Sequence, residues 1–128
     1  MLHHIELYVS DLERTREYWT WLLDELGYES FQSWEHGFSL KHGDTYIVFV
    51  QVDKEHSEAG YHRKRVGLNH LAFYASSKKQ VDSLAAQIKG RGDRLLYEDQ
   101  YPYAGGPSHY ALYAEDPDRI KVEIVAPL

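Results

Sequence analysis

The chain repeats one order of predicted elements, and this repetition limits its possible folds more than any other feature. An alternating segment over 3–9 predicts a strand. Apolar residues at helical spacing then predict a helix that Asp11 caps and Gly27 ends. After the helix, three short strands are predicted at 28–34, 37–41 and 45–52.

The second half of the chain gives the same order. A polar stretch over 53–65 predicts a connecting loop, and Ser77 with Gln80 forms a capping box at the start of a second helix. The strands around that helix are predicted at 69–75, 94–99, 108–114 and 120–126. Because one four-stranded unit would leave a sheet face uncovered, we expect one α+β domain over 1–128. Its two βαβββ modules, about 1–53 and 66–128, would form a half-open barrel with a helix outside each.

Composition excludes several classes of function. The 128 residues carry a formal net charge of −6, which disfavours partners that are bound through clustered cations, such as nucleic acid or an anionic membrane. The absence of Cys removes disulfides and thiolate chemistry. No apolar run approaches the ~20 residues of a membrane span, and the first residues do not resemble a signal peptide. We therefore expect a cytoplasmic protein.

Alternation along three of the predicted strands places several polar side chains on matching faces. In the first strand, His4, Glu6 and Tyr8 alternate with apolar residues that a helix should cover. His70 in the fifth strand and Glu123 in the last strand take the corresponding uncovered positions. If one curved sheet is built from both modules, His4, His70 and Glu123 project into its concave side.

Two imidazoles and one carboxylate suit a divalent transition metal with open coordination positions, namely Fe, Mn, Ni or Zn. The alternative is that each His is hydrogen-bonded without function and that Glu123 is solvated. For any single residue we favour this alternative. For all three together, on matching faces, we favour the metal site.

Three stretches of the sequence resemble the vicinal oxygen chelate superfamily. They are His4–Leu12, Gly67–Phe73 and Asp116–Glu123, and their order and spacing cover essentially the whole chain. That superfamily contains glyoxalase I, bleomycin-resistance proteins, fosfomycin-resistance thiol transferases and extradiol dioxygenases. The resemblance implies that the metal ligands are His4, His70 and Glu123, the residues that alternation also selects.

The sequence departs from the family pattern at two positions. Glyoxalase I has a fourth ligand, a Glu on the fourth strand, and aligning the two modules places Phe49 there, with Gln51 as a nearby source of oxygen. Phe cannot bind a metal, which counts against glyoxalase I itself. The family commonly has Gly where this chain has Arg119. Because other residues resist positive φ, we expect a different turn geometry at Arg119.

Other residues are candidates for catalysis or substrate binding. Glu6 or His109 would move a proton, although Glu6 could instead orient a ligating His, and His109 could simply bond a carbonyl. His3 has the wrong parity for the metal and is interpreted as an accidental neighbour of His4. The pocket is expected to be lined by Tyr8, Phe49, Tyr74, Tyr103 and Tyr113.

Two segments leave alternatives open. Residues 101–107 form either a lid hinged at Gly105 and Gly106 or an ordinary long loop. The cationic run 62–65 either attracts an anionic substrate or is a solvated linker.

The sequence therefore predicts a metal-dependent enzyme of the vicinal oxygen chelate type, acting on a small substrate through adjacent oxygens. Among reaction types we favour a lyase or isomerase reaction of the glyoxalase kind, and a dioxygenase reaction is the next candidate. The alternative is a non-catalytic protein that sequesters a small molecule, as bleomycin-resistance proteins do, and fosfomycin thiol transfer is a narrower possibility. The resemblance also implies a homodimer.

Overall fold

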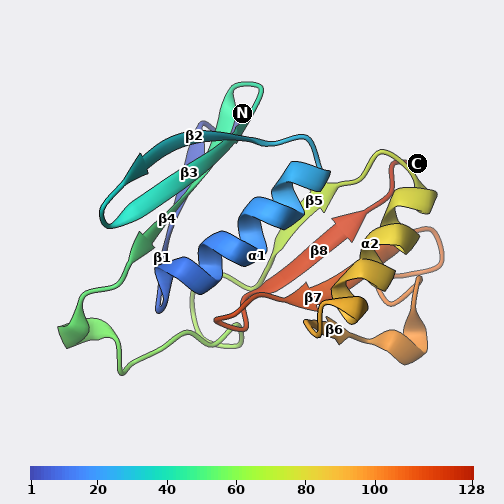
Figure 1. The fold of residues 1–128 in the computed structure, drawn as a ribbon. Coiled ribbons are helices and arrows are strands. Elements are labelled where there is room, and N and C mark those ends of the chain that lie inside the picture. The colour runs from blue at the N-terminus through green and yellow to red at the C-terminus, as the bar shows by residue number, and fades with distance from the viewer. The chain divides into compact units, whose positions relative to one another are not determined.

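The first of two structural units, Met1–Tyr61, is a four-stranded mixed sheet with one helix against one face. The computed structural model describes all residues, 1–128. The strands follow the order β1-β4-β3-β2, with β1 parallel to β4 and the other pairs antiparallel (Figure 1). The elements are β1 (His4–Val9), α1 (Leu12–Glu25), β2 (Glu29–Trp34), β3 (Gly37–His42), β4 (Thr45–Gln51) and the 3-10 turn η1 (Lys54–His56).

Helix α1 begins and packs as the sequence predicts. The Asp11 carboxylate accepts a hydrogen bond from the Arg14 backbone N–H at 3.2 Å, which satisfies one of the unpaired donors of the first turn. On its apolar face Trp19 is fully buried, and its ring centroid lies 5.1 Å from that of Phe49 on β4. Leu22 and Leu23 are buried on the same helix, and each large apolar side chain buried in this way stabilises the packing by roughly 1.5–3 kcal/mol.

The second unit, His62–Leu128, repeats this topology. Its strands follow the order β5-β8-β7-β6, with β5 parallel to β8, and α2 packs against β6, β7 and β8 (Figure 1). Its elements are β5 (Leu71–Tyr74), α2 (Lys78–Gly90), β6 (Arg94–Leu96), η2 (Glu98–Gln100), β7 (Ala111–Glu115) and β8 (Lys121–Val125). The predicted α+β class with two βαβββ units is confirmed. No helix is long and apolar enough to cross a membrane.

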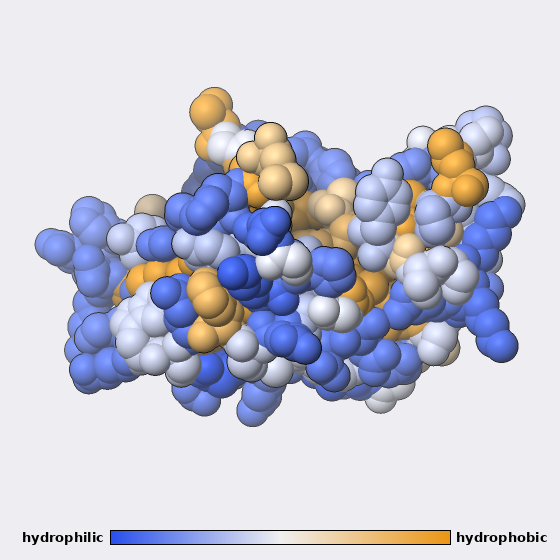
Figure 2. Space-filling view, turned by 90° about the horizontal axis from the view of Figure 1, so that it is seen from above, coloured by the Kyte–Doolittle hydropathy of each residue, from blue (hydrophilic) through white to orange (hydrophobic).

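Burial follows the predicted alternation in both units. Along β1 exposed and more buried residues alternate, with His4, Glu6 and Tyr8 on the exposed side. On α2 the buried residues are Val81, Leu84 and Ile88. At the surface, hydrophilic residues surround the hydrophobic ones that remain visible on the face drawn in Figure 2.

Two non-glycine residues, Tyr97 and Arg119, have positive φ, and at both positions the structure differs from the sequence-based prediction. Tyr97 (φ 57°) ends β6 at Leu96, three residues earlier than expected. Arg119 (φ 65°) takes the left-handed conformation that Gly would supply, so the prediction of a different turn geometry was wrong. The Asp116 carboxylate stabilises this turn by accepting from the backbone N–H groups of Asp118 (2.8 Å) and Ile120 (2.9 Å).

Because Arg119 has positive φ, we expect a Gly variant at this position to be more stable than an Ala variant. Arg119→Ala keeps a Cβ at positive φ, which costs about 1–2 kcal/mol, whereas Arg119→Gly removes that cost. Both variants lose the same guanidinium, so we expect the Ala variant to be less stable than the Gly variant by about 1 kcal/mol. Urea unfolding of both variants measures the difference, and equal midpoints would contradict a strained backbone at this position.

Candidate functional site

The face of the second sheet that α2 does not cover carries alternate residues of β7 and β8. The register pairs Tyr113 with Glu123, and Glu115 with Lys121. Because side chains alternate along each strand, all four project from the same face. Both carboxylates are buried, with Glu115 4% and Glu123 6% exposed. Since a buried carboxylate needs partners that replace water, the neighbours of each one define what this face can do.

Glu123 is surrounded by two imidazoles and a phenol. His109 Nε2 lies 2.7 Å from Glu123 Oε2, and His70 Nε2 lies 3.3 Å from Glu123 Oε1. The Tyr113 hydroxyl also bonds to Glu123. Burial raises the pKa of Tyr113 to about 12, and the adjacent Glu123 carboxylate adds to this effect. The Tyr113 phenol therefore stays protonated and remains a donor at neutral pH.

Asn69 fixes the orientation of the His70 ring. His70 Nδ1 lies 2.7 Å from Asn69 Oδ1, within hydrogen-bond distance, so the Asn69 side chain holds the imidazole ring in place. The other ring nitrogen, Nε2, is thereby directed at the Glu123 carboxylate. Either a proton or a metal ion between Nε2 and the carboxylate oxygen would satisfy both atoms.

The separation of these two atoms suits a metal ion. Two ligands that are each about 2.1 Å from one ion, at 90–109° to each other, lie roughly 3.0–3.4 Å apart. The observed separation of His70 Nε2 and Glu123 Oε1 is 3.3 Å. The donor set therefore fits a transition metal, although no group of three or more His, Asp or Glu residues in the structure is arranged to hold one.

Within the first unit, His4, Glu6 and Tyr8 project from one face of β1. The His4 ring stacks on Tyr46 of β4, with centroids 4.8 Å apart and an interplanar angle of 5°. His4 Nδ1 lies 2.8 Å from Nδ1 of the adjacent His3, at the exposed start of the strand. In each predicted His ligand, Nδ1 thus contacts the preceding residue, which is His3 for His4 and Asn69 for His70.

The alignment that placed Phe49 at the fourth-ligand position is wrong by one residue. Ala72 pairs with Glu123, and its counterpart Glu6 pairs with Val48, so Val48 takes the position equivalent to Glu123. Phe49 lies on the opposite face, fully buried under α1, and cannot line a pocket beside His4. Val48 cannot bind a metal either.

Gln51 does not supply the missing oxygen. Its Oε1 accepts from the Leu12 backbone N–H at 2.9 Å, and its Nε2 donates to Ser10 O at 2.9 Å. These contacts tie the end of β4 to the start of α1, so Gln51 has a structural role.

The segment 101–107 is fastened at one end and closely packed near the other. The Asp82 carboxylate of α2 accepts hydrogen bonds from Tyr101 and Tyr110, and the Tyr103 ring packs against Tyr110 with centroids 5.7 Å apart. These contacts place Tyr103 in a cluster with α2, and Tyr74 is 77% exposed.

Gly105 permits the close packing of this segment against the Glu123 cluster. A Cβ on Gly105 would lie 2.5 Å from the Tyr113 hydroxyl oxygen and 2.6 Å from His109 Cδ2. Glycine is required here because of this close approach. The sequence alone does not distinguish a glycine needed for close packing from a glycine that acts as a hinge.

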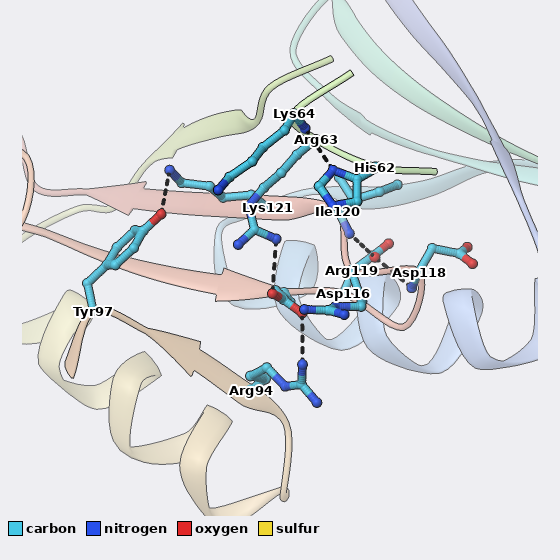
Figure 3. A network of polar contacts seen from close by, with 11 residues as sticks. His62, Arg63, Lys64, Arg94, Tyr97, Asp116, Asp118, Arg119, Ile120 and Lys121 are labelled. Carbon is cyan, nitrogen blue, oxygen red and sulfur yellow. Dashed lines mark hydrogen bonds and ion pairs between the residues drawn. The ribbon is translucent and has the colours of Figure 1, made fainter. Parts of the chain in front are cut away.

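Three guanidinium groups, those of Arg63, Arg94 and Arg119 (labelled in Figure 3), form ion pairs with Glu115, the second buried carboxylate. Arg63 donates to Oε1 at 3.0 Å, while Arg119 (3.1 Å) and Arg94 (3.5 Å) donate to Oε2. Lys121 lies beside this group and donates to the Tyr97 hydroxyl at 3.1 Å. We call Arg63, Arg94, Arg119, Lys121 and Glu115 the cationic cluster.

The chain belongs to the Glyoxalase/Bleomycin resistance protein/Dioxygenase superfamily, because the sequence model of that family matches residues 1–124. A protein of Bacillus subtilis, YqjT, is 56% identical over 126 residues, which are 98% of each chain. A crystal structure of a candidate glyoxalase from Bacillus halodurans has a TM-score of 0.98 and 59% identity, covering 99% of this chain and 96% of the other.

More distant structures share the fold. Lactoylglutathione lyase from Agrobacterium tumefaciens has a TM-score of 0.68 and 20% identity, covering 98% of this chain and 92% of the other. The fosfomycin resistance protein FosX from Listeria monocytogenes has a TM-score of 0.71 and 24% identity, covering 100% and 93%. At this level of identity the likeness concerns the fold alone.

The packing of Gly105 predicts a steric effect of a single methyl group. Gly105→Ala should lower the free energy of unfolding by about 1–3 kcal/mol and move the His109 ring away from Glu123. Denaturant unfolding and the NMR shifts of the His109 imidazole measure the two effects. The matched control is Gly90→Ala, where the added Cβ meets no atom within 4 Å. A Gly105→Ala variant with wild-type stability and His109 shifts would contradict the close packing.

Proposed function

We propose that this protein is a metal-dependent enzyme of the glyoxalase kind, acting on a small substrate held through adjacent oxygens. His4, His70 and Glu123 would hold one divalent transition metal, either Fe, Mn, Ni or Zn. When bound, such a metal polarises a carbonyl or stabilises an enolate, as lyase, isomerase and dioxygenase reactions of this superfamily require. By analogy with the superfamily, we infer a cytoplasmic homodimer.

The approach of His70 Nε2 to the buried Glu123 carboxylate, at 3.3 Å, is the observation that carries this proposal. His109 Nε2 lies 2.7 Å from the other Glu123 oxygen, which is an ordinary hydrogen-bond distance. His70 Nε2 lies farther from its oxygen, at 3.3 Å, and Asn69 contacts the opposite ring nitrogen, Nδ1, at 2.7 Å. This arrangement supports a cation-binding role for His70 and Glu123.

The remaining residues would bind the substrate and move a proton. His109 lies against Glu123, within reach of a group bound there, and would exchange a proton with the substrate. Glu6 is exposed on the face that His4 shares and is the second candidate for this step. The Tyr113 phenol, whose proton goes to Glu123 in this structure, would line the substrate site on the same face of the sheet. Tyr8 and Tyr74 are exposed aromatic surfaces for the rest of the substrate.

Metal content tests the proposal directly. The untagged protein, incubated with Fe(II), Mn, Ni or Zn and freed of excess metal, should retain close to stoichiometric amounts of at least one of them. His70→Ala and Glu123→Gln should lose it, because each removes one ligand atom. Elemental mass spectrometry measures the content, and His36→Ala, at an exposed turn, is the control.

The result also ranks the chemistry. Retained iron would favour a dioxygenase reaction, whereas nickel or zinc would favour a lyase or isomerase reaction. If the wild type retains none of the four metals, the enzyme proposal is rejected. The alternative is then a non-catalytic protein that sequesters a small molecule, in which Glu123→Gln leaves ligand binding intact.

Asn69 should act on the metal through the His70 ring. Asn69→Ala removes the acceptor for His70 Nδ1, and we expect metal affinity to fall roughly 10- to 100-fold. Asn69→Asp keeps an acceptor at the same position and should restore the affinity. Competition with a chromophoric chelator measures both values. Equal affinities of Asn69→Ala and wild type would show that Asn69 does not position His70.

A further inference from the structure

Both non-glycine residues with positive φ place their side chains at the cationic cluster. Arg119 (φ 65°) reaches Glu115, and Tyr97 (φ 57°) reaches Lys121. Each left-handed conformation costs about 1–2 kcal/mol and persists only where its surroundings enforce it. Such positions concentrate at binding sites. Their coincidence at one cluster indicates that this part of the second unit is shaped for binding.

The charges of the cluster do not balance. Three guanidinium groups contact one carboxylate, Glu115, and Lys121 lies beside them with its ammonium on the Tyr97 hydroxyl, so the cluster holds four cations and one buried anion. The nearby acids are engaged elsewhere: Asp116 accepts from its own turn, and Glu98 pairs with Lys89 at 2.8 Å. Within the second unit, Lys121 has no acidic partner. The excess positive charge is available to an anion in a chain whose net charge is −6.

Two of the cations converge on a single hydroxyl group. The Tyr97 oxygen accepts from Lys121 Nζ at 3.1 Å, and this hydrogen bond, together with the nearby charge of Arg63, holds the pKa of Tyr97 below its usual value. The proton of Tyr97 has no acceptor in the second unit. The Lys121 ammonium is further held over the rings of Tyr97 (4.9 Å) and Tyr113 (5.1 Å). The donors of an ammonium, a guanidinium and a phenol are thus gathered in one place.

We propose that Arg63, Tyr97 and Lys121 form a binding site for an oxyanion, the carboxylate or phosphoryl group of a small molecule. The guanidinium and ammonium donate charge-assisted hydrogen bonds to its oxygens, and the Tyr97 hydroxyl donates a neutral one. Lys121 projects from the same face of β8 as Glu123, two residues away, so an anionic group at Lys121 leaves the rest of its molecule beside Glu123. Its role as a substrate subsite rests on the proposed function, whereas oxyanion binding itself does not.

Titration of the full-length protein with inorganic phosphate, and separately with acetate, tests this site. Ionic strength is held constant with NaCl, and backbone amide NMR follows the chain. We expect saturable shifts at Arg63, Tyr97 and Lys121 with at least one of the two anions. Lys121→Met should weaken that binding about tenfold or more, and Tyr97→Phe several-fold with the ring contact preserved. Tighter phosphate binding would indicate a phosphoryl group, and tighter acetate binding a carboxylate.

The control separates specific binding from general charge effects. Lys79→Met removes an exposed cation of α2 and should leave the affinity unchanged. Shifts that never saturate, or equal affinities in Lys121→Met and wild type, would overturn the proposal.

Metal content, measured on the same preparations, separates this inference from the proposed function. If metal loads but neither anion binds, only the oxyanion site is rejected. If an anion binds but metal never loads, the proposed function fails and the site stands.

Discussion

Two buried carboxylates on one face of the second sheet determine how the residues around them are arranged. A carboxylate removed from water must be compensated by nearby donors or cations, and the chain compensates its two in different ways. Glu115 is held by three guanidinium groups, which are charged at any physiological pH. Glu123 is held by imidazoles and a phenol, which exchange protons or accept a cation. The pair Glu115 and Lys121 thus belongs to a cluster of permanent charges, whereas the next pair on the same face, Tyr113 and Glu123, belongs to a site whose groups can exchange protons.

The faces of the strands could be predicted because side-chain direction alternates with a period of two, whatever the register. Alternation alone placed His4, His70 and Glu123 on uncovered faces. The register between strands could not be predicted in the same way, because it depends on which residues of distant strands pair. A shift of one residue reverses the face, and for this reason Phe49, expected in the pocket, belongs to the core under α1 while Val48 takes the equivalent position.

The partners of the site residues were harder to predict where they come from loops and turns. Asn69 and His3 precede their partners directly and could have been noticed in the sequence. In contrast, Arg63 meets Glu115 across 52 positions of the chain, and no local pattern indicates that pairing. Left-handed backbone at Arg119 also contradicts local preference. Tertiary contacts, namely the Asp116 carboxylate and the ion pair with Glu115, offset its cost.

The cationic cluster also gives a physical reason why Tyr97 and Arg119 keep their strained, left-handed backbone conformations. Gly at position 119 would relax the backbone but remove a guanidinium from Glu115, and a β6 strand continued past Leu96 would direct Tyr97 away from Lys121. Each left-handed residue costs about 1–2 kcal/mol, and the contacts of these side chains with Glu115 and Lys121 offset that cost. The same contacts hold Arg119 and Tyr97 in one arrangement of donors. A fixed arrangement of donors is expected where a ligand must be bound in one orientation.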